Sequence, residues 1–232
     1  MSHRDIISLL KCRGEHCSSV YKLTEIKMKN KSIICFIRHG QTDWNTKGLM
    51  QGRDDIPLNE EGIRQAQEAS ASLKASLKKT SFKFDKIYTS PLSRASVTAQ
   101  AIGSAIGIEK IITDERLIER DFGALSGGHY DRYSKAVLEE TEEQSVEKVK
   151  SLLDRVNSFI FDNVKVGENV LLVTHGAVAR IYARNAKRAE RVSEIDIGML
   201  GNCHMVIYSY DGENILLEGY NVSPCSFNME EI

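Results

Sequence analysis

The chain has 232 residues, of which 41% are hydrophobic and 27% charged, a composition typical of globular proteins rather than disordered ones. Lys and Arg number 31 and Asp and Glu number 32, so the near-zero net charge argues against a global positive field that would gather nucleic acid. The longest apolar runs, such as 33–37 and 170–173, are far shorter than the ~20 residues that cross a bilayer. We therefore expect no membrane span and no nucleic-acid partner.

The five cysteines are odd in number and scattered, which favours reduced thiols in the cytoplasm over a disulfide framework. An apolar cluster at 6–10 is interrupted by Ser8 and is shorter than the h-region of a signal peptide, so we expect a cytoplasmic location. Met28 stands just before a predicted strand. We therefore treat residues 1–30 as an N-terminal extension, with Met28 as an alternative natural start, and residues 31–232 as a single domain.

The first predicted element is a strand at 32–38, a continuous apolar and β-branched run typical of a central strand buried on both faces of a parallel sheet. A loop rich in Gly, Asp and Asn follows at 40–59. Asn59 is a good N-cap and predicts a helix that ends near Lys79. The spacing predicts that its buried face carries Ile63, Ala66, Ala69, Leu73 and Leu77.

Further along the chain, strand and helix patterns alternate. They predict a strand at 84–89, a helix from 90 to about 107, a strand at 110–113, helices at about 130–140 and 145–164, a strand at 169–174 and a helix at about 178–186. This alternation predicts a three-layer α/β/α sandwich with a mainly parallel sheet. The tail predicts a hairpin with a two-residue turn at Asp211-Gly212, which ends the sheet as an edge or supports a homodimer. The sequence does not distinguish between these two roles of the hairpin.

Three groups of reactive side chains directly follow predicted strands: Arg38 with His39, Ser90 leading to Arg94, and His175. Because ligand sites open at the carboxyl ends of parallel strands, we expect these side chains to converge. A neutral imidazole is a good nucleophile toward phosphorus, and guanidiniums hold the non-bridging oxygens and stabilise their growing charge. A carboxylic acid would then protonate the leaving group. The pattern therefore favours phosphoryl transfer.

Five blocks of sequence strengthen this interpretation. They are Arg38-His39-Gly40-Gln41-Thr42 with Asp43-Trp44-Asn45, then the run from Gly52 to Leu58 with Gly62, then Thr89 to Ala95, then Glu119 to Gly123, and finally Thr174-His175-Gly176. In this order and spacing they resemble the signature of the histidine phosphatase superfamily, the phosphoglycerate mutase-like proteins, over about residues 32–210.

The resemblance implies a role for each matched residue. His39 would be the phosphorylated nucleophile, Glu119 the general acid, and Arg38, Arg94 and His175 the rest of the catalytic phosphate pocket. Glu115 and Asp121 remain alternative acids. Substrate contacts would also come from Asn45, Gln51, Gly52 and Gly176. The resemblance implies no metal and no organic cofactor, with a small-molecule phosphate ester as the binding partner.

Two departures from the mutases of this family favour hydrolysis. His175 follows Glu119 by only 56 residues, which leaves no room for the mutase insertion that helps to close the site, and Ala177 stands where mutases have Asn. A short, open cap keeps water away from phosphohistidine poorly. We expect a phosphatase, with a 2,3-bisphosphoglycerate-dependent phosphoglycerate mutase and a non-catalytic phosphate-binding module as alternatives.

A cap segment at about 121–145 is expected to choose the substrate. The cap offers Arg120, His129, Tyr130, Arg132 and Tyr133. We expect some of these side chains to face the ester and most to be ordinary surface residues. Arg53 would add positive charge at the mouth of the site or form a salt bridge with Asp54 or Asp55.

Overall fold

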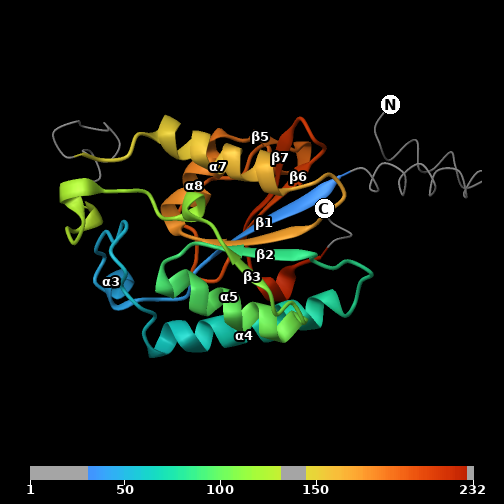
Figure 1. Cartoon of the computed structure of the whole chain (residues 1–232), viewed down its shortest axis with the longest axis horizontal. Coiled ribbons are helices and arrows are strands. Elements are labelled where there is room, and N and C mark those ends of the chain that lie inside the picture. The colour runs from blue at the N-terminus through green and yellow to red at the C-terminus, as the bar shows by residue number, and fades with distance from the viewer. Residues whose placement is uncertain (1–30, 132–144, 229–232) are drawn as a thin grey trace, which may run out of the picture.

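The computed structural model describes residues 31–131 and 145–228. A seven-stranded sheet with the order β3-β2-β4-β1-β6-β7-β5 forms the middle layer (Figure 1). The strands are β1 (Ser32–Arg38), β2 (Lys86–Thr89), β3 (Ile111–Thr113), β4 (Val170–Thr174), β5 (Lys187–Arg188), β6 (Met205–Tyr210) and β7 (Ile215–Val222). The four strands from β3 to β1 are parallel, whereas β6 is antiparallel to both β1 and β7.

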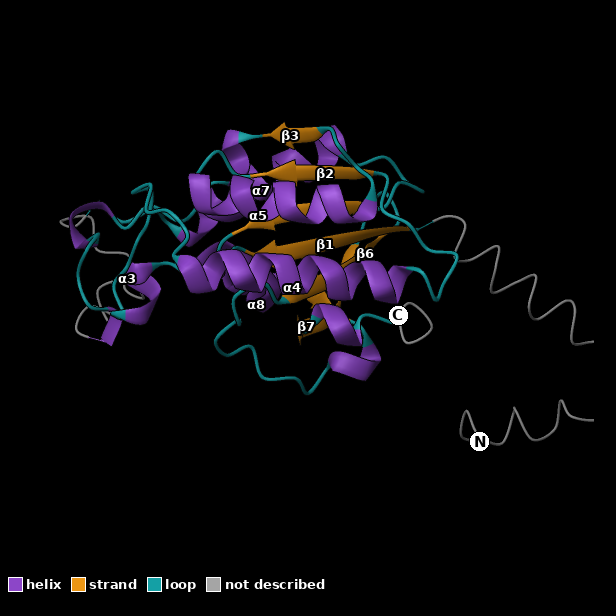
Figure 2. Ribbon diagram, turned by 90° about the horizontal axis from the view of Figure 1, so that it is seen from below, coloured by secondary structure: helices purple, strands orange, loops and turns teal. Residues whose placement is uncertain are grey.

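Helices cover both faces of this sheet, which confirms the predicted three-layer arrangement. The α-helices are α3 (Asp43–Thr46), α4 (Glu60–Leu77), α5 (Ser93–Ile106), α7 (Val149–Asn163) and α8 (Gly176–Asn185). Helices α4 and α5 lie on one face, and α7 and α8 lie on the other (Figures 1 and 2). No helix within 31–131 and 145–228 is long and apolar enough to cross a membrane.

Strand β1 is buried on both faces of the sheet, which is why residues 33–37 form an unbroken apolar run. Its side chains alternate between the two faces, so Ile34 and Phe36 join the core beneath α7 and α8. Cys35 and Ile37 join the second core, beneath α4 and α5. Both faces are therefore dry, and β1 ends at the same edge of the sheet as its parallel neighbour β4.

Helix α4 begins as predicted, with the Asn59 side chain accepting a hydrogen bond from the N–H of Gly62. Its buried stripe includes Gly62, Ala66, Ala69 and Leu73. The prediction for Ile63 was wrong, because this side chain is 45% exposed. The helix faces the body of the protein through Gly62, and the next residue is turned by about 100° from that face.

Other boundaries also differ from the sequence prediction. The predicted loop at 40–59 contains α3, which Thr42 and Asn45 stabilise through a capping box. The hairpin turn between β6 and β7 spans four residues, 211–214, rather than two. The hairpin does not end the sheet, because β5 pairs with β7. The helix predicted at about 130–140 lies outside the described residues except for its first two positions.

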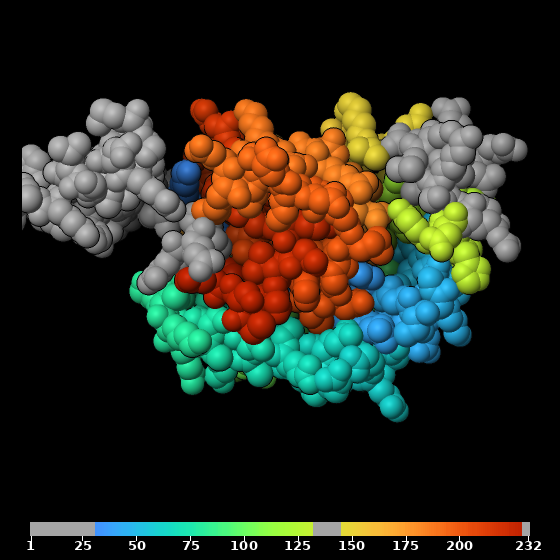
Figure 3. Space-filling model, turned by 180° about the vertical axis from the view of Figure 1, so that it is seen from behind, coloured from blue at the N-terminus to red at the C-terminus, as the bar shows by residue number. Residues whose placement is uncertain are grey.

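The carboxyl ends of β1, β2 and β3 point toward one end of the molecule, where α3 and the loops around it lie (Figure 2). Here the segment 48–50 is hydrogen-bonded to the start of the cap, through Met50 N–H to the Gly128 carbonyl at 2.9 Å and Tyr130 N–H to the Gly48 carbonyl at 3.0 Å. Seen from behind, the C-terminal residues occupy the centre of the surface in orange and red, with α4 in teal along the lower side (Figure 3).

Candidate active site

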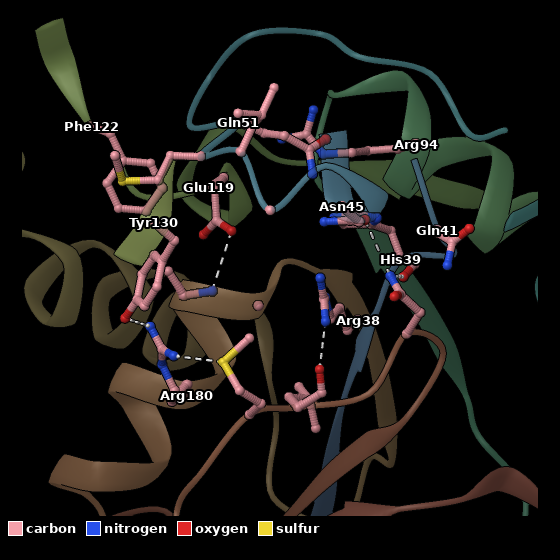
Figure 4. A pocket seen from close by; sticks show the side chains of 18 of the residues that line it. Arg38, His39, Gln41, Asn45, Gln51, Arg94, Glu119, Phe122, Tyr130 and Arg180 are labelled. Atoms are coloured by element: carbon pink, nitrogen blue, oxygen red, sulfur yellow. Dashed lines mark hydrogen bonds between the residues drawn. The ribbon is translucent and has the colours of Figure 1, made fainter. Parts of the chain in front are cut away.

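A cavity of about 550 Å³ opens at the carboxyl ends of the central strands (Figure 4). Most of the residues that the sequence singled out line it: Arg38, His39, Asn45, Gln51, Arg94, Glu119 and Gly176. Two others lie directly behind the lining. His175 is fully buried with its ring 5.2 Å from that of His39, and the Gly52 carbonyl accepts a hydrogen bond from Arg94.

The ring of His39 is held in one tautomer by its own loop. Its Nδ1 atom lies 2.6 Å from the carbonyl oxygen of Gly40, and a carbonyl can only accept, so Nδ1 carries the proton. The pKa of His39 lies well below its ordinary value because the ring is buried and because Arg94 and Arg38 are close. The imidazole is therefore neutral at neutral pH, with a lone pair on Nε2.

His175 is fixed in the same tautomer, with its proton on Nδ1, by Ser90. Its Nε2 lies 2.8 Å from Ser90 Oγ, which also accepts a hydrogen bond from the N–H of Leu92. Since the hydroxyl proton of Ser90 has no other acceptor among the described residues, it is donated to Nε2, and Nδ1 then carries the ring proton. This Nδ1 is buried without a partner in the described part of the chain. Burial first, and then Arg94, lower the pKa of His175 well below its ordinary value.

Two guanidiniums flank the histidines, and backbone carbonyls hold both of them. Arg94 is fully buried and donates to the carbonyls of Asp54 at 2.6 Å and Gly52 at 2.8 Å. An arginine in the first turn of a helix is usually solvated, but Arg94 is not. Arg38 donates to the carbonyl of Leu200 at 2.5 Å. Burial lowers the pKa of each guanidinium. The Nε atoms of both are buried and have no partner among the described residues.

Gly176 lets the start of α8 approach Arg38 closely. A Cβ atom at position 176 would lie 3.2 Å from Arg38 Nε. This distance is tighter than usual van der Waals contact, so a larger residue would press on the guanidinium.

The carboxylate of Glu119 lies against the N-terminus of α8. It accepts hydrogen bonds from the N–H groups of Ala177 and Val178, each at 3.2 Å, and is only 7% exposed. Neither of the alternative acids lines the cavity. Asp121 instead accepts from the N–H of Gly123 and pairs with Arg53, and Glu115 begins a short 3-10 helix.

An amide network connects the loop after β1 to the loop that precedes β6, the antiparallel neighbour of β1. Asn202 donates to the carbonyl oxygen of His39 at 2.9 Å and to Oδ1 of Asn45 at 3.4 Å. Gln51 accepts from the Thr42 hydroxyl at 3.0 Å. Asn202 was not predicted as a site residue. Its position just before β6, which runs antiparallel to β1, is the feature of the sequence that could have indicated it.

The far end of the cavity is mostly apolar and is formed by the cap, α8 and the loops that carry residues 49–50 and 199. Its lining includes Leu49, Met50, Phe122, Tyr130, Met199 and Arg180. Of the other cap candidates, Arg120 donates to the carbonyl of Glu147, and the exposed His129 lies outside the lining. Arg132 and Tyr133 fall outside the described residues.

Arg53 forms neither of the salt bridges proposed for it. It lies 3.5 Å from Asp121 and 3.8 Å from Glu147, because the nearer acids have other partners. Asp54 accepts from the Ser126 hydroxyl and Asp55 from the N–H of Ser93. Within 31–131 and 145–228, no group of three or more His, Cys, Asp or Glu side chains is arranged to hold a metal ion.

Comparison with known proteins places this geometry in a family. The sequence model described as Histidine phosphatase superfamily (branch 1) matches residues 34–223. An uncharacterized phosphatase, PhoE, from Bacillus subtilis is 32% identical over 83% of this chain and 95% of its own length. A 2,3-bisphosphoglycerate-dependent phosphoglycerate mutase from Mesorhizobium japonicum is 34% identical over 71% of this chain and 87% of its own length.

Solved structures agree with these sequence matches. A phosphoglycerate mutase from Bacillus anthracis superimposes with a TM-score of 0.71 at 21% identity, covering 86% of this chain and 97% of that one. A phosphoserine phosphatase from Entamoeba histolytica, in complex with 3-phosphoglyceric acid, has a TM-score of 0.64 at 25% identity, covering 84% and 100%. The chain belongs to the histidine phosphatase superfamily and has the fold of its enzymes.

Proposed function

We propose that the protein hydrolyses small-molecule phosphate monoesters through a phosphohistidine intermediate on Nε2 of His39. The observation that carries this proposal is the hydrogen bond between His39 Nδ1 and the Gly40 carbonyl, which places the ring proton on Nδ1, so that the neutral ring has its lone pair on Nε2. Cationic groups whose Nε–H donors have no partner among the described residues flank that ring, as binding of phosphate oxygens requires.

In the first step the Nε2 lone pair attacks phosphorus and the bond to the ester oxygen breaks. Arg38 and Arg94 hold the non-bridging oxygens, and the buried Nδ1–H of His175 donates to one of them. Glu119 gives its proton to the departing alkoxide, so the alcohol leaves neutral. Asn45 and Gln51 border the bound phosphoryl group.

In the second step water takes the place of the alcohol. The Glu119 carboxylate removes a proton from water, and the oxygen attacks phosphorus while the bond from phosphorus to Nε2 breaks. Inorganic phosphate, neutral His39 and protonated Glu119 result. One general acid and base therefore serves both steps.

Two features of the sequence favour hydrolysis over transfer of the phosphoryl group to another position of the substrate. His175 follows Glu119 by only 56 residues, and Ala177 occupies the position after the His-Gly pair. The second candidate function is that of a phosphoglycerate mutase, and the identity with relatives of that name favours it. A non-catalytic phosphate-binding module is the third.

The test compares the full-length wild type with the His39→Ala variant on p-nitrophenyl phosphate in excess EDTA. We expect the substitution to reduce kcat/KM by about 10³-fold or more, because the covalent route is lost. His129→Ala is the matched control, since this exposed histidine lies outside the cavity lining. Wild-type activity no greater than that of His39→Ala would refute the phosphatase.

Two further measurements separate the candidate functions. Quenching the wild type during turnover of a radiolabelled ester should trap label that survives alkali and is lost in acid, as expected for phosphohistidine, and His39→Ala should trap none. Incubation with 3-phosphoglycerate and 2,3-bisphosphoglycerate then compares 2-phosphoglycerate formed with inorganic phosphate released. A ratio well above one would assign the mutase, and phosphate binding without either product would assign the binding module.

A further inference from the structure

Arg180 is a third arginine in the cavity wall, and it lies away from the histidines. Among the described residues, its guanidinium forms hydrogen bonds only with neutral groups: Nη1 lies 3.2 Å from Met199 Sδ, and Nη2 donates to the Tyr130 hydroxyl at 3.0 Å. The central carbon of this guanidinium lies 5.5 Å from the centre of the Tyr130 ring. Its Nε is buried without a hydrogen-bond partner in the described part of the chain.

No acid among the described residues forms an ion pair with Arg180. Most other arginines near the cavity pair with a carboxylate or a backbone carbonyl, as Arg53 does with Asp121. Asp131 also lines the cavity and has interactions of its own. Within the described residues, Arg180 therefore offers its charge to a ligand from a wall that is otherwise largely apolar.

The position of Arg180 allows it to contact the leaving group rather than the transferred phosphoryl group. It follows Gly176 by four residues on α8, so the two lie on the same face of the helix about one turn, or ~6 Å, apart. In Figure 4, Arg180 and Tyr130 lie on the side of the cavity that also holds Glu119 and Phe122, away from Arg94 and His39. That is the side on which the general acid meets the departing oxygen.

A guanidinium held only by neutral contacts in an apolar wall is well suited to an anion. Its planar set of donors matches a carboxylate or a phosphate, and the low local dielectric strengthens the attraction. Tyr130 and Met199 hold the side chain in place before the ligand arrives, so little conformational entropy is lost on binding. Neutral substituents would gain no comparable interaction there.

We infer that Arg180 is a specificity-determining residue that binds a second anionic group on the leaving group. The preferred substrates would then be phosphate monoesters that carry a carboxylate or second phosphate about one helical turn, ~6 Å, from the transferred phosphoryl group. A spacer of two or three carbon atoms meets this requirement. The inference rests on the proposed phosphatase function and names its substrate class.

The test uses substrate pairs that differ in one charged group. The first pair is 3-phosphoglycerate and glycerol 3-phosphate, and the second is propane-1,3-diol bisphosphate and 3-hydroxypropyl phosphate. We expect the wild type to prefer the more anionic member of at least one pair, and Arg180→Met to reduce that preference in kcat/KM by about 10- to 100-fold. The pair that responds identifies the anion as a carboxylate or a phosphate.

Two variants act as controls. Arg180→Lys keeps the charge and should restore part of the preference. Arg184→Met removes an arginine of the same helix that instead donates to the carbonyl of Ile197, outside the cavity lining, and should leave the preference unchanged. If Arg180→Met does not fold, the wild-type ratios and those of Arg180→Lys decide.

The outcomes separate this inference from the proposed function. Wild-type hydrolysis no greater than that of His39→Ala would refute the phosphatase itself. Hydrolysis that depends on His39 but shows equal kcat/KM within both pairs would overturn only the role of Arg180. An equal loss on all four substrates in folded Arg180→Met would overturn it as well, because that result indicates a structural role.

Discussion

Replacing Gly62 with alanine tests how closely α4 holds the loop that carries the nucleophile. A Cβ atom at this position would lie 2.0 Å from the carbonyl oxygen of Gln41 and 2.8 Å from its nitrogen. Ordinary contact begins at 3.4 Å, so the loop and the helix must separate by roughly 1.4 Å. Gln41 is two residues from His39, and the adjacent Gly40 also lies against the Gly62 carbonyl.

The expected effect is a loss of activity larger than the loss of stability. A misplacement of about 1 Å at a reacting group costs on the order of 10²-fold in rate, so kcat/KM for p-nitrophenyl phosphate should fall by about that factor. The free energy of unfolding changes less, because strain of about 1–3 kcal/mol is partly offset by the ~1 kcal/mol helix propensity that alanine gains over glycine.

Gly103→Ala is the matched control for this variant. A Cβ atom there would meet the carbonyl oxygen of Ile108 at 2.5 Å, a comparable clash between α5 and the segment that follows it, but Gly103 does not line the cavity. Its folded fraction should retain a kcat near the wild-type value, with stability measured by urea unfolding. A folded Gly62→Ala variant with kcat/KM within about threefold of wild type would refute the coupling between α4 and the nucleophile.

Three further predictions concern the site itself. Asn202→Ala removes the hydrogen bond to the His39 carbonyl, so kcat/KM in steady-state kinetics should fall about tenfold. The circular dichroism spectrum should match that of the wild type, and unchanged kinetics would contradict this positioning role. Glu119→Gln should lower kcat/KM for glycerol 3-phosphate by about 10²- to 10⁴-fold but much less for p-nitrophenyl phosphate, whose leaving group needs no proton, and equal losses would argue against Glu119 as the acid. Burial and the nearby arginines keep the pKa of His39 and His175 low, so neither ring should contribute an acid limb near pH 6.5 to the kcat/KM profile. The unfolding free energy should nevertheless fall as the pH drops below about 6.5, because the unfolded chain binds protons there that the folded chain does not, and a pH series of urea titrations checks the sign.

The parts of the fold that follow from local pattern were predictable. Strands β1 and β4 are doubly buried and read as continuous apolar runs, so their ends were placed correctly, together with Arg38, His39 and His175. The short helix α3 was missed because its capping box lies in a stretch rich in turn residues. Ile63 was misplaced because its apolar character outweighed the steric need for Gly62 to face the loop.

The contacts that depend on tertiary packing were not predictable. Asn202 reaches His39 only because β6 pairs antiparallel with β1, a pairing that no motif announces. Arg180 resembles any other helical arginine in the sequence, and only the cavity distinguishes it. Arg94 was predicted as a site residue from the family resemblance, whereas its complete burial against two backbone carbonyls follows from the course of the 52–54 loop.

The pairing of β1 with β4 joins residues that are far apart in the chain, since Arg38 lies opposite Thr174. His39 and its buried neighbour His175 are therefore brought together across 136 positions of the sequence. A nascent chain that has not yet formed β4 has His39 but no His175 beside it, so catalytic competence would appear only after this late, long-range contact closes. A chain truncated before β4 would therefore lack His175 and could not assemble the site.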